Sequence, residues 1–227
     1  MANDRVLGLA CLPMLSALDY LSLAPRAAAA FVLGAVPFAW LIVRLAKGID
    51  VRTLGSGNVG ATNACRAFSG KARICVFLLV YLLDAGKGLL GTMLGWGVAT
   101  GGLLSGNNLL GAVICAACAI LGHVFTPFLG GRGGKGVATA TGALAALDWR
   151  VTAIALGVFF LVRFLSGQVF FGSLALGLGL AGAAIAVDYE DAFDKRLPLT
   201  ILCIVVALFL FWTHRSNLAK FLASRQT

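Results

Sequence analysis

The chain has 227 residues, of which 60% are hydrophobic and only 12% are charged. A soluble domain carries about 25% charged residues, so this composition excludes an ordinary soluble protein and requires apolar side chains to face lipid. The formal net charge of +9 would suit nucleic-acid binding, but its uneven distribution favours a membrane protein that binds no nucleic acid.

Residues 6–23 are apolar but contain Pro13 and Asp19, and they lack the basic start and cleavage site of a secretory signal. We expect residues 1–26 to form an interfacial or re-entrant extension, with an eighth membrane span as the alternative. Residues 27–227 are expected to form a single membrane domain, because neither a long linker nor an internal repeat divides them.

Seven apolar runs follow, separated by short charged stretches. They cover residues 27–43, 74–94, 103–121, 137–147, 151–165, 169–187 and 199–212. The fourth run is shorter than the roughly 20 residues that a helix needs to cross a bilayer, so it either crosses obliquely or begins inside the preceding loop. The sequence predicts an all-α, polytopic membrane protein with about seven transmembrane helices.

The positions of basic residues predict the orientation of these helices. With seven spans and the N-terminus outside, the inner side receives Arg44, Lys47, Arg52, Arg66, Lys71, Arg73, Arg132, Lys135, Arg163, Arg215, Lys220 and Arg225. The outer loops receive Arg150, Lys195 and Arg196 together with Asp148, Asp188, Glu190, Asp191 and Asp194. Because cytoplasmic loops are rich in lysine and arginine, we expect a cytoplasmic C-terminus, in the cell (inner) membrane.

Cysteines and glycines within the apolar runs are expected to be structural. Cys115 and Cys118 are three residues apart, but no second pair or histidine cluster completes a metal site. We expect the cysteines to pack against apolar neighbours, with neither a metal nor a cofactor required. Glycines such as Gly88, Gly91 and Gly95 let helix backbones approach one another closely.

The first polar loop, residues 54–66, reads LGSGNVGATNACR. Its hydroxyls (Ser56 and Thr62) and amides (Asn58 and Asn63) can bond a small polyol, and the Arg66 guanidinium can bind a phosphate with two hydrogen bonds. Asn63 and Arg66 are three residues apart and can share a helix face. The alternative is a turn that only caps the next span.

The second polar loop has glycine at positions 130, 131, 133, 134 and 136, interrupted by Arg132 and Lys135. Glycines let backbone N–H groups turn toward an anion, so Gly131, Gly133 and Gly134 are expected to bind phosphate beside both cations. A nucleotide P-loop is excluded, because it would need glycine at 129 and serine or threonine at 136. A flexible loop that only obeys the positive-inside rule is the alternative.

Ionisable residues inside an apolar run are functional candidates, because charge is costly in the bilayer. Asp84 and Lys87 lie in the second run, three residues apart, and can neutralise each other. Lys87 is therefore a candidate binding residue, with snorkelling toward the inner face as the alternative. Arg163 and Ser166, at the inner end of the fifth run, are weaker candidates.

The last apolar run ends in His214 and Asn217, at i and i+3, on the same predicted side as both glycine loops. A hydroxyl nucleophile needs a base, which could be His214, His123 or a phosphate oxygen of the substrate. The sequence lacks an acyltransferase His-x4-Asp signature, since Phe128 and Ala219 stand at that spacing. Ser56 lacks the Gly-x-Ser-x-Gly spacing of a hydrolase elbow.

These segments resemble the bacterial membrane-integral glycerol-3-phosphate acyltransferases that use acyl phosphate as donor. The resemblance covers roughly residues 30–220 and is most specific in residues 56–66 and 130–139. Asp84-x-x-Lys87 and His214-x-x-Asn217 fit at the expected places. It implies seven spans with the N-terminus outside and acyl transfer to the 1-hydroxyl of glycerol 3-phosphate, giving lysophosphatidate and phosphate in phospholipid synthesis.

Carried over residue by residue, the resemblance implies that the catalytic residues are Ser56, Arg66, Lys135, His214 and Asn217. Three departures stand out: the family's serine-rich stretch retains only Ser166 here, Arg132 replaces a frequent lysine, and residues 222–225 lack the usual Gly-x-Glu.

As a mechanism, we expect the cations and the loop N–H groups to hold the phosphates of glycerol 3-phosphate and acyl phosphate, with the acyl chain among membrane lipids. We expect no carboxylate at this site that could act as the base. A phosphate oxygen of the donor is therefore expected to take the proton of the glycerol hydroxyl. The alternatives are a membrane transporter of organic phosphates and a non-catalytic lipid or scaffold protein.

Overall fold

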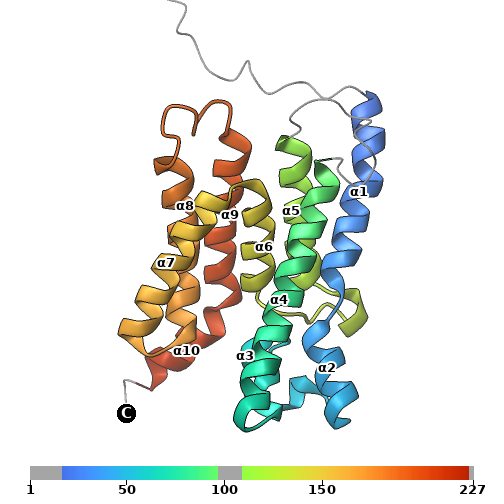
Figure 1. Ribbon diagram of the computed structural model, residues 1–227, viewed down its shortest axis with the longest axis vertical. Helices are drawn as coiled ribbons and strands as arrows, with labels where there is room; N and C mark the ends of the chain where they lie inside the picture. The colour runs from blue at the N-terminus through green and yellow to red at the C-terminus, as the bar shows by residue number, and fades with distance from the viewer. Residues whose placement is uncertain (1–16, 97–108, 225–227) are drawn as a thin grey trace, which may run out of the picture.

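The structure is a computed structural model that describes residues 17–96 and 109–224. Within these ranges the chain is helical and contains no β-strand (Figure 1). The helices are α1 (Ala17–Ala35), α2 (Phe38–Lys47), α3 (Ala61–Ala64), α4 (Gly70–Gly95), α5 (Leu109–Val124), α6 (Val137–Leu147), α7 (Trp149–Ser166), α8 (Val169–Ala186), α9 (Leu197–Thr213) and α10 (Arg215–Ala223). Short 3-10 turns cover Val51–Thr53, Cys65–Ala67 and Pro127–Leu129.

All seven apolar runs form helix over most of the residues that the structure describes; residues 103–108 of the third run lie outside the described residues. The first run is divided, because Pro37 separates α1 from α2. Proline lacks an N–H and disfavours helix at the residue before it. Helix α1 also begins at Ala17, within the segment expected to be an extension, and residues 6–16 lie outside the described part.

The chain is a multi-pass membrane protein. Five helical segments of the described residues are long and apolar enough to cross a membrane, and six are if α9 and α10, which are bent by 47°, count as one span. Helix α6 has only 11 residues, which agrees with the short fourth run. The count of seven spans and the position of the N-terminus stay predictions.

Small residues allow neighbouring helices to pack closely. Helix α6 lies against α4, and a Cβ built on Gly142 would come within 1.8 Å of the Ala85 carbonyl oxygen. In the same interface a Cβ on Gly88 would lie 2.1 Å from the Thr139 carbonyl oxygen. Only glycine permits this approach of the two backbones, so the predicted packing role of Gly88 is confirmed.

The two ends of the helix bundle differ in character. The loop between α8 and α9 lies at the upper end in Figure 1, whereas α2, α3 and α10 lie at the lower end. At the upper end Asp148 forms ion pairs with Arg150, at 2.9 Å, and with Arg196. Burial disfavours the charged form of Asp148, but hydrogen bonds from Arg150 outweigh it, and the pKa of Asp148 is lowered. The site candidates gather at the lower end.

Candidate active site

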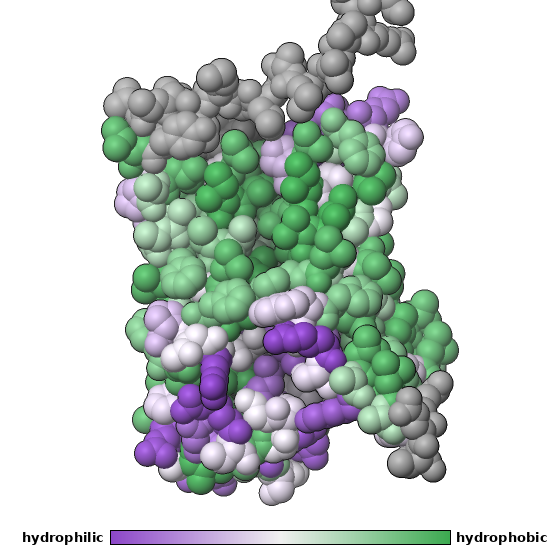
Figure 2. Space-filling model, turned by 180° about the vertical axis from the view of Figure 1, so that it is seen from behind, coloured by the Kyte–Doolittle hydropathy of each residue, from purple (hydrophilic) through white to green (hydrophobic). Residues whose placement is uncertain are grey.

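A pocket at the lower end is lined by three segments that are far apart in the sequence. These are the 56–66 segment, the start of α6 and the bend between α9 and α10. Its polar lining includes Ser56, Asn58, Thr62, Asn63, Arg66, Asp84, His123, Lys135, His214 and Asn217. Figure 2 shows a hollow bordered by hydrophilic side chains in the lower half of the rear face. The three segments predicted to converge therefore share one pocket.

Asn63 folds the first loop. Its side chain is buried, donates to the carbonyl oxygens of Val51 (2.9 Å) and Asn58 (3.0 Å), and accepts from the Ser56 N–H (3.2 Å). These three bonds occupy the amide within the protein. Asn63 was expected to contact the substrate. Its hydrogen bonds instead fit a residue that positions Ser56 and Asn58.

Arg66 reaches the same loop from the adjacent turn. A Cβ built on Gly55, whose φ is +46°, would lie 2.1 Å from Arg66 Nη1 and 2.8 Å from Asn63 Oδ1. Asn63 and Arg66 thus share one face, as their spacing predicts, and Gly55 leaves room for both. Among the described residues, no ion pair includes Arg66. Its charge can therefore serve an anionic ligand.

The backbone of the glycine-rich loop differs from the expectation. The N–H groups of Gly131, Gly133 and Gly134 donate to the carbonyl oxygens of Thr126 (2.9 Å), Val124 (3.0 Å) and His123 (3.1 Å). The carbonyls in the last turn of a helix lack partners within that helix, and the loop supplies partners to two of them at the end of α5. The prediction that these three N–H groups bind phosphate is wrong, since each already has a partner.

Groups that can bind an anion lie slightly further along the chain. Lys135, Gly136, Val137 and Ala138 line the pocket, and α6 begins at Val137. The first N–H groups of a helix have no partner within it and favour a negative charge. The start of α6 beside Lys135 can therefore bind a phosphate.

Lys135 is held between the loop and the C-terminal bend. Its ammonium donates to the Asn217 side-chain oxygen, and its carbonyl accepts from Thr213 Oγ1 at 3.1 Å. Burial, with a smaller effect of Lys220, lowers the pKa of Lys135 to about 8. Lys135 therefore still carries its charge at neutral pH, but it loses its proton at a lower pH than an exposed lysine does.

His214 lies at the bend after α9, and its side chain is buried. Its Nδ1 is 2.8 Å from the Leu210 carbonyl oxygen. Because a carbonyl only accepts, we assign the ring proton to Nδ1, which leaves Nε2 as an acceptor in the neutral ring. His214 can thus accept a hydrogen bond from a substrate hydroxyl.

The structure adds a carboxylate to the pocket. Asp84 and His123 both contribute to its lining, so the expectation that no carboxylate lies at the site is wrong. Lys87, the candidate from the same helix, instead donates to the Val36 carbonyl oxygen at 2.7 Å and is not part of the lining. The i, i+3 spacing of Asp84 and Lys87 had signalled the pair, but it could not show which member faces the pocket.

The remaining candidates lie around the pocket rather than in it. Arg132, Gly133 and Gly134 line an adjoining pocket that shares Ser56, Asn58, Lys135 and Asn217 with the first. Gly131 lines neither pocket. Ser166 also lines neither, and its hydroxyl donates to the Val162 carbonyl oxygen at 2.6 Å, within its own helix.

Apolar side chains form the other wall of the pocket. Phe77 and Tyr81 come from α4, Phe159 from α7 and Phe170 from α8. No sequence pattern singled out these residues, because aromatic residues occur in most of the apolar runs. One pocket therefore combines cations that can bind phosphate with aromatic side chains that can contact a hydrocarbon chain.

A family model described as "Glycerol-3-phosphate acyltransferase" matches residues 26–224. The chain belongs to the glycerol-3-phosphate acyltransferase family. The resemblance inferred from the motifs is confirmed, which favours the enzyme over the transporter and scaffold alternatives.

Relatives and solved structures agree with this family. The chain is 35% identical over 212 residues to a glycerol-3-phosphate acyltransferase of Caulobacter vibrioides, covering 93% of this chain and 90% of the relative. It is 36% identical over 200 residues to glycerol-3-phosphate acyltransferase 1 of Deinococcus radiodurans, covering 86% and 90%.

Crystal structures of PlsY (YgiH), an integral membrane glycerol 3-phosphate acyltransferase, have the same fold. The glycerol 3-phosphate form matches with a TM-score of 0.74 and 28% identity, over 90% of this chain and 94% of that one. The lysophosphatidic acid form matches with a TM-score of 0.72 and 27% identity, over 90% and 93%.

Proposed function

We propose that this protein transfers an acyl group from acyl phosphate to the 1-hydroxyl of glycerol 3-phosphate. The products are lysophosphatidate and inorganic phosphate, as in an early step of phospholipid synthesis. The observation that carries the proposal is the pocket itself, whose lining combines Arg66, Lys135 and the start of α6 with aromatic side chains. Such a pocket suits a reaction that joins a phosphorylated polyol to a hydrocarbon chain.

The polar groups fit separate parts of this reaction. Arg66, Lys135 and the first N–H groups of α6 bind phosphate, and Ser56, Asn58 and Thr62 contact the glycerol. His214 Nε2 and the Asn217 amide orient the 1-hydroxyl toward the acyl carbonyl carbon. Orientation and charge neutralisation supply most of the rate enhancement.

The transfer is direct in this proposal. The glycerol oxygen forms a bond to the acyl carbon as the bond between that carbon and the phosphate oxygen breaks. The hydroxyl proton passes to a phosphate oxygen of the donor, so that inorganic phosphate leaves with it. Neither metal nor cofactor takes part, and an acylated Ser56 trapped in a single turnover would contradict direct transfer.

We further propose a location in the cell (inner) membrane, with the N-terminus outside and the site open to the cytoplasm. The lower end of the bundle carries the loops whose basic residues indicate a cytoplasmic side, and glycerol 3-phosphate is a water-soluble anion.

Purified protein incubated with glycerol 3-phosphate and acyl phosphate is expected to form lysophosphatidate. Acyl-carrier and acyl-coenzyme A thioesters, tested in parallel, identify the donor. Lack of product with every donor would reject the proposal. Product with only a thioester would reject the proposed donor.

A further inference from the structure

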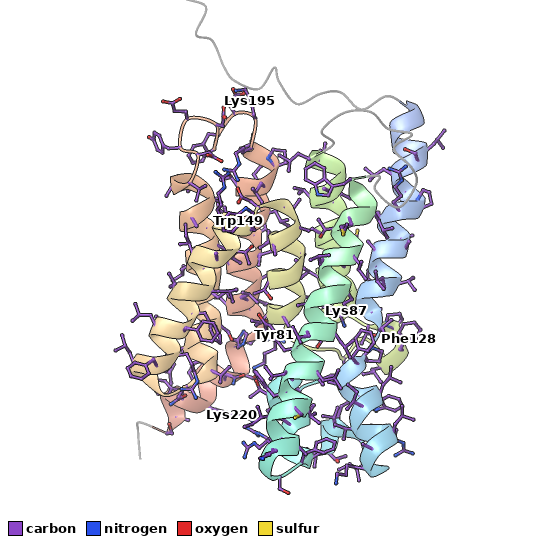
Figure 3. All side chains as sticks on the ribbon, viewed as in Figure 1. Tyr81, Lys87, Phe128, Trp149, Lys195 and Lys220 are labelled. Atoms are coloured by element: carbon purple, nitrogen blue, oxygen red, sulfur yellow. The ribbon has the colours of Figure 1, made fainter. Side chains whose placement is uncertain are left out.

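Three buried ionisable side chains lie beside the glycine-rich loop. They are Asp84 and Lys87 of α4 and His123 of α5, and each is no more than 6% exposed. Figure 3 shows Lys87 on α4 above Tyr81, away from Lys220 at the lower end. Because ionisable groups are costly within a membrane, a buried cluster of them indicates a function.

Lys87 anchors the cluster to the first helices. Its Nζ is 2.8 Å from Asp84 Oδ1, donates to the Val36 carbonyl oxygen at 2.7 Å, and lies 5.5 Å from the centre of the Phe38 ring. These contacts fix its ammonium at the break between α1 and α2, where proline interrupts the helix. Lys87 thus provides a fixed positive charge for Asp84.

Asp84 connects Lys87 to His123. Its Oδ1 is 3.6 Å from His123 Nδ1 and 2.8 Å from Lys87 Nζ, so this buried oxygen lies between the two side chains. A buried acceptor of this kind strongly attracts a nearby donor. The carboxylate therefore orients the imidazole with Nδ1 toward α4.

His123 in turn supports the loop through its ring and its backbone. A Cβ built on Gly134 would lie 2.0 Å from His123 Nε2, so the ring packs directly on the Gly134 backbone. The His123 carbonyl accepts the Gly134 N–H at 3.1 Å. Gly134 immediately precedes Lys135, so a shift of the imidazole would displace the ammonium that faces the pocket.

We infer that Asp84 and His123 are positioning residues: they hold Gly134 so that Lys135 and the start of α6 meet the phosphate of the substrate. The inference rests on the proposed function, since it assigns these residues to the phosphate end of that same site. It also explains why α4 contains a buried ion pair, although burying apolar side chains there would cost less free energy. Neither side chain needs to touch the substrate.

The test compares Asp84→Asn with Asp148→Asn in purified protein. Both changes remove a buried carboxylate from an ion-pair cluster, but Asp148 lies at the opposite end of the bundle. Three quantities are measured: the thermal unfolding midpoint, the Kd of glycerol 3-phosphate by calorimetry without donor, and KM and kcat with acyl phosphate.

We expect both variants to lose thermal stability, whereas only Asp84→Asn raises the Kd and KM for glycerol 3-phosphate, by about tenfold or more. His123→Ala, which leaves the Asp84–Lys87 ion pair intact, is expected to raise them similarly and carries the test if Asp84→Asn does not fold. Unchanged Kd and KM in the folded variants, or an equal rise in Asp148→Asn, would overturn the inference. If the unmodified protein binds no glycerol 3-phosphate, the proposed function itself fails.

Discussion

The ammonium of Lys135 donates a hydrogen bond to the side-chain oxygen of Asn217, which lies 82 residues further along the chain. This bond joins the loop before α6 to the first turn of α10. The same two residues line both adjoining pockets, so they form the boundary between them. The contact gives the C-terminal bend a direct part in placing the cation that we assign to phosphate binding.

Replacement of Lys135 by alanine is expected to remove most activity. A hydrogen bond to a charged group contributes about 1.5–3 kcal/mol, so kcat/KM should fall roughly 10–150-fold. The variant should still insert into the membrane, because the loop keeps its backbone hydrogen bonds. Lys195→Ala, which removes an exposed lysine at the upper end, is the matched control. Retained activity in Lys135→Ala would reject the assignment.

The activity is expected to weaken in alkaline solution. The pKa of Lys135 is lowered to about 8, chiefly by burial. The ammonium is therefore charged below pH 8 and neutral above it, whereas a phosphate monoester, with a second pKa of about 6, keeps its charge across this range. KM for glycerol 3-phosphate should rise between pH 7 and pH 9. In Lys135→Arg the rise should be weaker, since arginine stays protonated; identical profiles would contradict this explanation.

Asn63→Ala is expected to lower both stability and activity. The change removes three hydrogen bonds from a buried side chain, each of which contributes about 1 kcal/mol. The unfolding free energy should fall by about 2–4 kcal/mol. Thr62→Ala, one residue away and exposed in the pocket, should raise KM with little loss of stability. Equal loss of stability in both variants would show that Asn63 does not hold the loop.

Gly142→Ala is expected to separate α6 from α4. The added methyl group would lie 1.8 Å from the Ala85 carbonyl oxygen, which a backbone cannot avoid by a side-chain rotation. We expect the free energy of unfolding to fall by roughly 1–3 kcal/mol and kcat/KM to fall in parallel, because Lys135 lies two residues before the start of α6. Gly182→Ala is the control, since no atom lies within 4 Å of its Cβ position. A neutral Gly142→Ala would contradict the close approach.

The helices could be predicted from hydropathy because each crossing needs a long apolar run. The convergence of Ser56, Lys135 and Asn217 was also predictable, since polar segments separated by an even number of spans lie on the same side of the membrane. Hydropathy could not reveal the separation of α1 from α2, which depends on the single residue Pro37.

The glycines of the second polar loop did not indicate whether that loop binds an anion or packs against another part of the chain. The run around Gly133 and Gly134 looked like an anion-binding loop, but a Cβ on Gly133 would lie 2.0 Å from the His123 carbonyl oxygen. These glycines allow the loop to cap α5. Sequence patterns cannot distinguish a backbone that approaches a ligand from one that approaches another backbone, because both require the absence of a side chain. Likewise, the spacing of Asp84 and Lys87 predicted their pairing but not the neighbour that Asp84 would orient.

The shortness of α6 has a consequence for the depth at which the proposed reaction would occur. Eleven residues rise about 17 Å, little more than half of a hydrocarbon layer that is roughly 30 Å thick. With its other end at the outer boundary of this layer, the start of α6, where we propose that phosphate binds, would lie inside the layer, and the loop before α6 would enter it from the proposed cytoplasmic side. In the proposed reaction, glycerol 3-phosphate would meet the acyl donor at this depth, and the hydrocarbon chains of the donor and of the product would stay within the bilayer.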